Sequence, residues 1–140
     1  VNENDFLTPE ELDFSDNDQL ATFLAGMLGA QKLILLSNID GLFDRNPKKE
    51  GAKKIASVPK ITAEIESYVC TEKSSRGLGG MASKIKAAKI LSALGIEMIL
   101  GNSRQKGILL EPEKWGTQFL AEETKEKAGI KVWLLAGAYE

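Results

Sequence analysis

Three glycines, Gly77, Gly79 and Gly80, stand directly ahead of a helical pattern that carries Lys84 in its first turn. Glycine has no Cβ, so backbone N–H groups in such a loop can approach a ligand closely. A helix N-terminus adds N–H groups without helical acceptors and a partial positive charge. These features favour a phosphate site, but Ser83 precedes Lys84, so the spacing is not that of a P-loop. The alternative is a flexible loop before an ordinary helix with a solvated lysine.

A second group of polar side chains follows the apolar run 32–37, which predicts a strand covered on both faces, as in a parallel sheet. The turn after it, residues 37–41, supplies hydroxyl, amide and carboxylate groups and ends in Asp40-Gly41. Ligands of open α/β sheets gather at the carboxyl ends of strands, so this turn lies where a binding loop is expected. A plain Asp-Gly turn is the simpler interpretation.

Hydrophobic spacing predicts the elements that position these groups. Residues 15–18 are helix-capping types, and Asp16 and Asp18 can be explained as caps alone. One apolar helix face follows them: Leu20, Phe23, Leu24, Met27 and Leu28. The helix after the glycine loop carries another: Ile85, Ala88, Leu91 and Leu94. Further strands are expected at 53–58, 96–100, 116–120 and 131–135, with short helices from residue 62 and near 108–110. Alternating helices and strands predict an α/β fold.

Composition limits the classes of function. The 140 residues predict one domain, 1–140, with a formal charge of −2. The absence of a basic stripe and the few aromatic residues argue against nucleic acid, and no apolar run reaches membrane-spanning length. Cys70 is the single cysteine, which excludes an internal disulfide and fits a cytoplasmic location. The lack of histidine removes His-based triads and most zinc sites, and no metal site is expected.

Four segments occur in an order and spacing that resembles the glutamate 5-kinases of the amino-acid kinase family. They are Val-Asn-Glu-Asn-Asp at 1–5, Phe-Ser-Asp-Asn-Asp at 14–18, the strand and turn at 35–43, and Gly-Gly-Met-Ala-Ser-Lys at 79–84. The Gly-Thr-Gln-Phe segment at 116–119 also fits, so the resemblance covers nearly the whole chain. It implies a three-layer αβα sandwich with a mainly parallel sheet. It also implies a partial domain, which carries the ATP-binding portion and lacks the N-terminal half.

The resemblance further implies an activity: transfer of the γ-phosphoryl group of ATP to the side-chain carboxylate of L-glutamate, in proline biosynthesis. Asp18 and Lys84 would be the catalytic residues, and Asn2, Asp5 and Asn17 would hold glutamate. The nucleotide-binding residues would be Ser37, Asn38, Leu78, Gly79, Gly80, Met81, Ala82, Ser83 and Lys84. ATP would enter with Mg²⁺, and the full-length enzyme would be a homo-oligomer. A carboxylate nucleophile is ionised at neutral pH, so no general base is required.

Some positions depart from the family pattern. Asn38 stands where the family usually has Asp, and Leu78 where it has Thr or Arg. The first strand of the family, with its Lys-x-Gly-Ser phosphate loop, is not in this sequence, so we expect little or no kinase activity from these residues alone. Two alternatives stay open. The first alternative to a glutamate 5-kinase is a non-catalytic nucleotide-binding or regulatory module. The second is part of a kinase of the same fold that acts on another acceptor.

Overall fold

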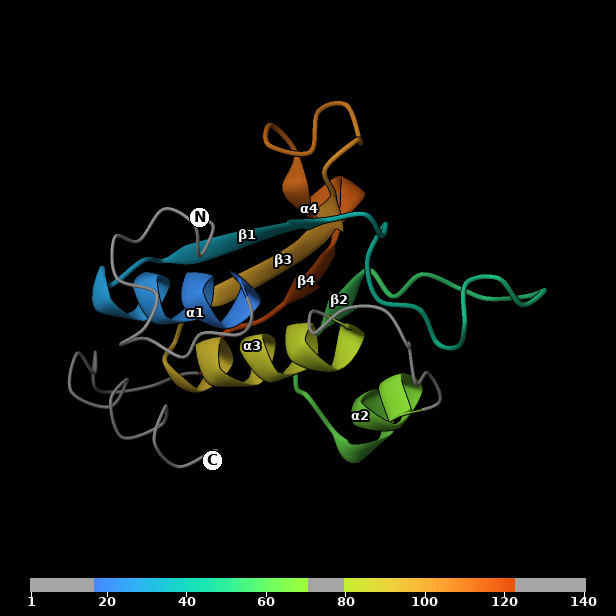
Figure 1. The fold of residues 1–140 in the computed structure, drawn as a ribbon, viewed down its shortest axis with the longest axis horizontal. Coiled ribbons are helices and arrows are strands. Elements are labelled where there is room, and N and C mark those ends of the chain that lie inside the picture. The colour runs from blue at the N-terminus through green and yellow to red at the C-terminus, as the bar shows by residue number, and fades with distance from the viewer. Residues whose placement is uncertain (1–16, 71–79, 123–140) are drawn as a thin grey trace.

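The fold is seen in a computed structural model that describes residues 17–70 and 80–122 (Figure 1). Its elements in chain order are α1 (Asn17–Met27), β1 (Lys32–Ser37), β2 (Ser57–Val58), α2 (Ala63–Cys70), α3 (Met81–Ala93), β3 (Glu97–Asn102), α4 (Pro112–Trp115) and β4 (Thr117–Phe119). Helices and strands alternate along most of this order, as the sequence predicts. The expected strand at 131–135 lies outside the described residues.

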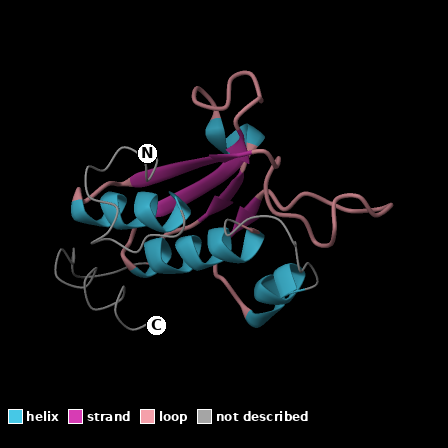
Figure 2. Ribbon diagram, viewed as in Figure 1, coloured by secondary structure: helices cyan, strands magenta, loops and turns pink. Residues whose placement is uncertain are grey.

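The strands form one mixed sheet in the order β1-β3-β4-β2 (Figure 2). β1 runs parallel to β3, and β2 runs parallel to β4, whereas β3 and β4 are antiparallel. Two of the three pairings are therefore parallel, in agreement with the expected mainly parallel sheet. Ser37 pairs with Asn102, so β1 and β3 end at the same edge of the sheet.

The hydrophobic core lies between α3 and one face of the sheet. Ile85, Ala88 and Leu91 of α3 are buried, and they join a cluster that includes Leu35 of β1 and Leu100 of β3. The apolar face expected for this helix is confirmed, with Leu94 partly buried beside it. The helix α3 packs on the central strand β3 and leads into it. The first turn of α3 therefore lies near the end of β3, and the last turn of α3 lies near the start of β3.

The buried face of α1 differs in part from the expected one. Leu20 is buried, but Met27 and Leu28 are 59% and 81% exposed, so their assignment to the core face is wrong. Small residues contact the core instead: Ala25 and Gly26 are both buried. Small side chains allow α1 to lie close to α3 and β1, and spacing alone gave no reason to prefer them over the larger residues.

The second face of the sheet is covered mainly near the end of β3. Ile99 is fully buried and lies against Gly116, the residue that follows α4. Leu36 of β1 points to this same face, because it pairs with Gly101, and it is 43% exposed. The expectation that both faces of β1 are covered is therefore wrong at Leu36. Helices nevertheless flank the sheet on both sides, with α1 and α3 opposite α4.

Two short elements begin or end elsewhere than expected. The region 108–110 consists of turns, in which the amides of Leu110 and Glu111 both donate to the carbonyl of Gly107. The helix α4 begins at Pro112 instead, because a residue before proline avoids the helical conformation, as Glu111 does with φ −135° and ψ 61°. β2 covers two residues rather than six.

None of the helices in 17–70 and 80–122 is long and apolar enough to span a membrane.

Candidate functional site

The first turns of α1 and α3 lie at the edge of the sheet where β1 and β3 end (Figure 1). Each helix runs back along its strand, and a short connection then leads into that strand: residues 28–31 join α1 to β1, and 94–96 join α3 to β3. We call this region, formed by the helix starts and the strand ends, the carboxyl edge. Polar side chains from four separate parts of the chain gather there.

An ion pair joins the two helix starts. The Nζ atom of Lys84 lies 2.8 Å from Oδ2 of Asp18, although the residues are 66 positions apart. Both side chains are largely buried, with 8% of Lys84 and 14% of Asp18 exposed. The first turn of α1 is further tied by Thr22, whose hydroxyl donates to the carbonyl of Asp18 at 2.7 Å. The ammonium of Lys84 is thus held at a defined place beside the start of α3.

Among the described residues, no side chain caps the first turn of α3. Gly80 is the N-cap residue, its backbone is extended (φ −70°, ψ 179°), and it makes no side-chain capping hydrogen bond. The amides of Met81 and Ala82 belong to the turn in which N–H groups lack acceptors within the helix. Such a turn, with the positive end of the helix dipole, can accept an anion. Lys84 adds a full positive charge at the same helix start.

The turn after β1 is tied to the turn after β3. The amide of Ser103 donates to the carbonyl of Ser37 at 2.8 Å, and the side-chain amide of Asn102 donates to Oδ1 of Asp40 at 2.8 Å. The hydroxyl of Ser37 lies 3.3 Å from Oδ1 of Asn38, to which it donates. Asp40 and Asn102 were not predicted as site residues. Their place directly after predicted strands was the signal that could have identified them.

A third tie to this turn comes from Thr117, the first residue of β4, which sequence analysis did not select. Its side chain is fully buried, its Oγ1 accepts from the amide of Leu42 at 2.8 Å, and it donates to the carbonyl of Ile55 at 2.6 Å. The only signal in the sequence was its place directly after Gly116, at the start of a predicted strand. The partners lie 75 and 62 positions away, beyond the reach of any local pattern.

The structure places nine of the thirteen predicted site residues at the carboxyl edge: Asn17, Asp18, Ser37, Asn38, Gly80, Met81, Ala82, Ser83 and Lys84. The other four, Asn2, Asp5, Leu78 and Gly79, lie outside the described residues. Contacts join Asp18 to Lys84 and Ser37 to Asn38. The helix starts and the turn after β1 share the edge of the sheet, while the proposed role of each residue stays a prediction.

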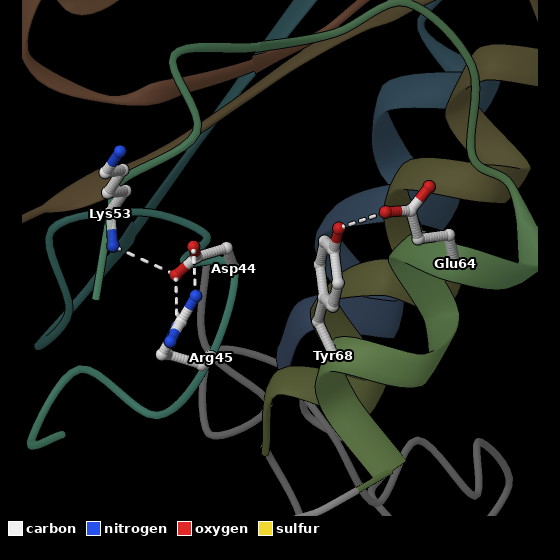
Figure 3. A network of polar contacts seen from close by, with 5 residues as sticks. All are labelled: Asp44, Arg45, Lys53, Glu64 and Tyr68. Carbon is white, nitrogen blue, oxygen red and sulfur yellow. Dashed lines mark hydrogen bonds and ion pairs between the residues drawn. The ribbon is translucent and has the colours of Figure 1, made fainter. Parts of the chain in front are cut away.

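Asp44 and Tyr68, which follow the turn after β1 in the chain, have shifted pKa values, and each forms hydrogen bonds with neighbouring groups (Figure 3). The backbone amide of Lys53, followed by the guanidinium of Arg45, lowers the pKa of Asp44 below its usual value. Tyr68 donates to Glu64 at 2.6 Å, and this hydrogen bond raises the pKa of the phenol. Asp44 closes the excursion 44–53, because its carboxylate accepts from the Lys53 amide at 2.9 Å. Both contacts are exposed: the first closes the loop 44–53, and the second lies within α2.

Among the described residues, the carboxylates of Asp18 and Asp40 lie at this edge. Across residues 17–70 and 80–122, no group of three or more Asp, Glu, Cys or His side chains is arranged to hold a metal ion.

Several known proteins are similar in sequence to nearly the whole of this chain. A glutamate 5-kinase of Methanosarcina mazei is 45% identical over 99% of this chain, and one of Methanosarcina barkeri is 47% identical over 96%. Glutamate 5-kinase 2 of Bacillus subtilis is 44% identical over 96%. The chain spans 37% of the length of each of these relatives.

A solved structure shares the fold at lower identity. The carbamate kinase from Giardia lamblia, bound to AMP-PNP, matches 76% of this chain and 36% of its own with a TM-score of 0.54 and 21% identity. The family model described as the amino acid kinase family matches residues 1–102. That match covers most of the chain, and it includes the strand end and both helix starts of the carboxyl edge. The chain therefore belongs to the amino acid kinase family.

Proposed function

We propose that residues 1–140 are the ATP-binding portion of a larger glutamate 5-kinase domain. In the reaction, an oxygen of the glutamate side-chain carboxylate attacks the γ-phosphorus of ATP. The bond from that phosphorus to the β,γ-bridging oxygen breaks, so that ADP leaves and glutamyl 5-phosphate forms. The relatives named glutamate 5-kinase, 41–47% identical over nearly the whole chain, support this assignment.

The observation that carries the proposal is the ion pair between Asp18 and Lys84 across the two helix starts. Phosphoryl transfer to a carboxylate must bring two anions together, and positioned positive groups offset their repulsion. We propose that the Lys84 ammonium and the amides at the start of α3 contact the phosphate oxygens. Asp18 holds that ammonium in place and organises the polar network. Since the nucleophile is already ionised, no residue has to remove a proton.

The remaining roles follow the family resemblance. Ser37 and Asn38 contact the nucleotide from the end of β1, together with the loop and helix start at 78–84. Asn2, Asp5 and Asn17 hold glutamate. Mg²⁺ would be supplied together with ATP, where it would offset the negative charge of the phosphates. We also propose a cytoplasmic reaction in proline biosynthesis, and a homo-oligomer for the full-length enzyme, which size-exclusion chromatography with light scattering tests.

Titration calorimetry with Mg-ATP tests the nucleotide site in this chain directly. Lys84→Met keeps the buried aliphatic stem and removes the charge, so we expect the Kd to rise at least tenfold, or about 1.4 kcal/mol. Lys89→Met is the matched control, because Lys89 lies on the same helix but pairs with Glu66 at 2.8 Å and is half exposed. The control should bind Mg-ATP like the unchanged chain. Equal affinity of both variants, or no binding by the unchanged chain, would contradict the proposal.

Acceptor specificity separates the proposed activity from the alternatives. Turnover of the full-length enzyme is followed by ADP release, which any acceptor produces, and hydroxylamine converts an acyl phosphate product to a hydroxamate. With glutamate the enzyme should release ADP and give the hydroxamate. It should not do so with aspartate or a nucleoside monophosphate. Turnover with one of these instead would favour a kinase with another acceptor. Mg-ATP binding without turnover on any acceptor would favour a regulatory module. Residues 1–140 by themselves should show little or no turnover.

A further inference from the structure

Thr117 uses its one hydroxyl twice inside the protein. The Oγ1 atom donates to the carbonyl of Ile55 at 2.6 Å and accepts from the amide of Leu42 at 2.8 Å. The residue has no exposed surface. A buried hydroxyl that meets two backbone groups satisfies both, and its loss would leave a buried donor and a buried acceptor without partners. Thr117 therefore fixes the backbone at Leu42, where the turn after β1 ends.

Gly41 lies directly against this threonine. A Cβ atom placed on Gly41 would overlap Oγ1 of Thr117 and would lie 3.3 Å from both the Cβ and the backbone nitrogen of Thr117. The φ of Gly41 is +140°, a conformation that residues with a side chain rarely adopt. A glycine thus allows the backbone of the turn to approach the hydroxyl that holds it.

The turn is held at both ends by different strands. At its start, the carbonyl of Ser37 accepts from Ser103, after β3, and at its end the amide of Leu42 donates to Thr117 on β4. Between these points lies Asn38, whose side chain is exposed and accepts from the Ser37 hydroxyl. The span 37–42 therefore has a fixed backbone with its polar groups at the carboxyl edge.

We propose that Thr117 is a positioning residue for nucleotide binding. Its hydroxyl holds the turn 37–42 in the one shape in which Ser37 and Asn38 meet the nucleotide. This inference rests on the proposed function, because it takes the turn after β1 to be part of the ATP site. Thr117 itself is buried beneath the turn and acts through the Leu42 amide, so it does not contact the ligand.

The decisive variant is Thr117→Val, which keeps the shape of the side chain and removes the hydroxyl. If the turn then holds its binding shape about one tenth of the time, the Kd for Mg-ATP rises about tenfold. Thr117→Ser retains the hydroxyl and should bind within about twofold of the unchanged chain. The amide of Leu42 should exchange with solvent faster in the valine variant than in the serine variant.

Ser92→Ala is the matched control for loss of a buried hydroxyl. Ser92 is buried in α3 and donates to the carbonyl of Leu120 at 2.9 Å, just past the end of β4. Because β4 is antiparallel to β3, this contact lies toward the opposite edge of the sheet from Thr117. The alanine variant should melt at a lower temperature and still bind Mg-ATP normally, which separates positioning from a general loss of stability.

Two outcomes would overturn the role of Thr117. One is Mg-ATP binding by the valine variant within about twofold of the unchanged chain, since a tenfold effect follows from the turn's loss of shape. The other is measured on the unchanged chain, so it applies even if Thr117→Val does not fold. Saturating Mg-ATP should slow the exchange of the Leu42 amide with solvent. If the exchange is not slowed, the proposal is contradicted. Absence of any Mg-ATP binding by the unchanged chain would instead contradict the proposed function, and this inference with it.

Discussion

Lys84 and Asp18 meet at 2.8 Å between the first turns of α3 and α1, and both side chains are largely buried. The contact fastens two helix starts to each other at the carboxyl edge of the sheet. It also fixes a positive charge beside the backbone amides of α3. The same pair thus connects the packing of the two helices with the proposed phosphate site.

Removal of both partners of this pair should destabilise the chain by less than the sum of the two single removals. Asp18→Asn and Lys84→Met should each lower the free energy of unfolding by about 3 kcal/mol, because the remaining group loses its buried partner. The double variant should lose at least about 1 kcal/mol less than the sum of the two single losses. Urea denaturation of the four proteins measures this coupling, and simple additivity would show that the two residues do not stabilise each other.

Substitution of Gly41 should cost more than substitution of another glycine with positive φ. Gly41→Ala should lower the free energy of unfolding by about 3 kcal/mol, through backbone strain and overlap with Thr117. Gly29→Ala is the matched control: its φ is +59°, but nothing lies within 4 Å of the added Cβ, so about 1 kcal/mol is expected. Equal losses in urea denaturation would mean that the approach to Thr117 is not tight.

The carboxyl of Asp44 should titrate at a lower pH in the folded chain than in the unfolded chain. The amide of Lys53 and the guanidinium of Arg45 favour its ionised form and so lower its pKa. A group with a lowered folded pKa stabilises the fold above its unfolded pKa, about 3.9 for Asp, and this contribution is lost as pH falls through the folded pKa. Carbon-13 NMR titration of the carboxyl, with and without urea, measures both midpoints.

Arg45→Gln provides the control for this titration. The variant should raise the folded midpoint of Asp44 only part of the way, since the hydrogen bond from the Lys53 amide is the larger cause of the lowered pKa. Identical midpoints in the folded and urea-unfolded chain would contradict the contact that closes the excursion 44–53. A full return to the unfolded midpoint in Arg45→Gln would assign the whole shift to the guanidinium.

Local patterns in the sequence determined much of the architecture. The apolar run at 32–37 and the spacing of Ile85, Ala88 and Leu91 identified the strand β1 and a core helix, because period and side-chain type decide burial over a few residues. The same patterns misassigned Met27 and Leu28, which the structure leaves exposed. Periodicity marks an apolar face, but it does not say whether small residues beside that face make the closer contact.

The tertiary structure alone decided which of these residues meet. Lys84 reaches Asp18 because α1 and α3 pack side by side with their first turns at one edge, and Thr117 reaches Leu42 because β4 runs antiparallel to β3. Both contacts bridge more than 60 positions of the chain. Local backbone preferences act over a few residues, whereas such distant contacts depend on how whole elements pack around a shared core.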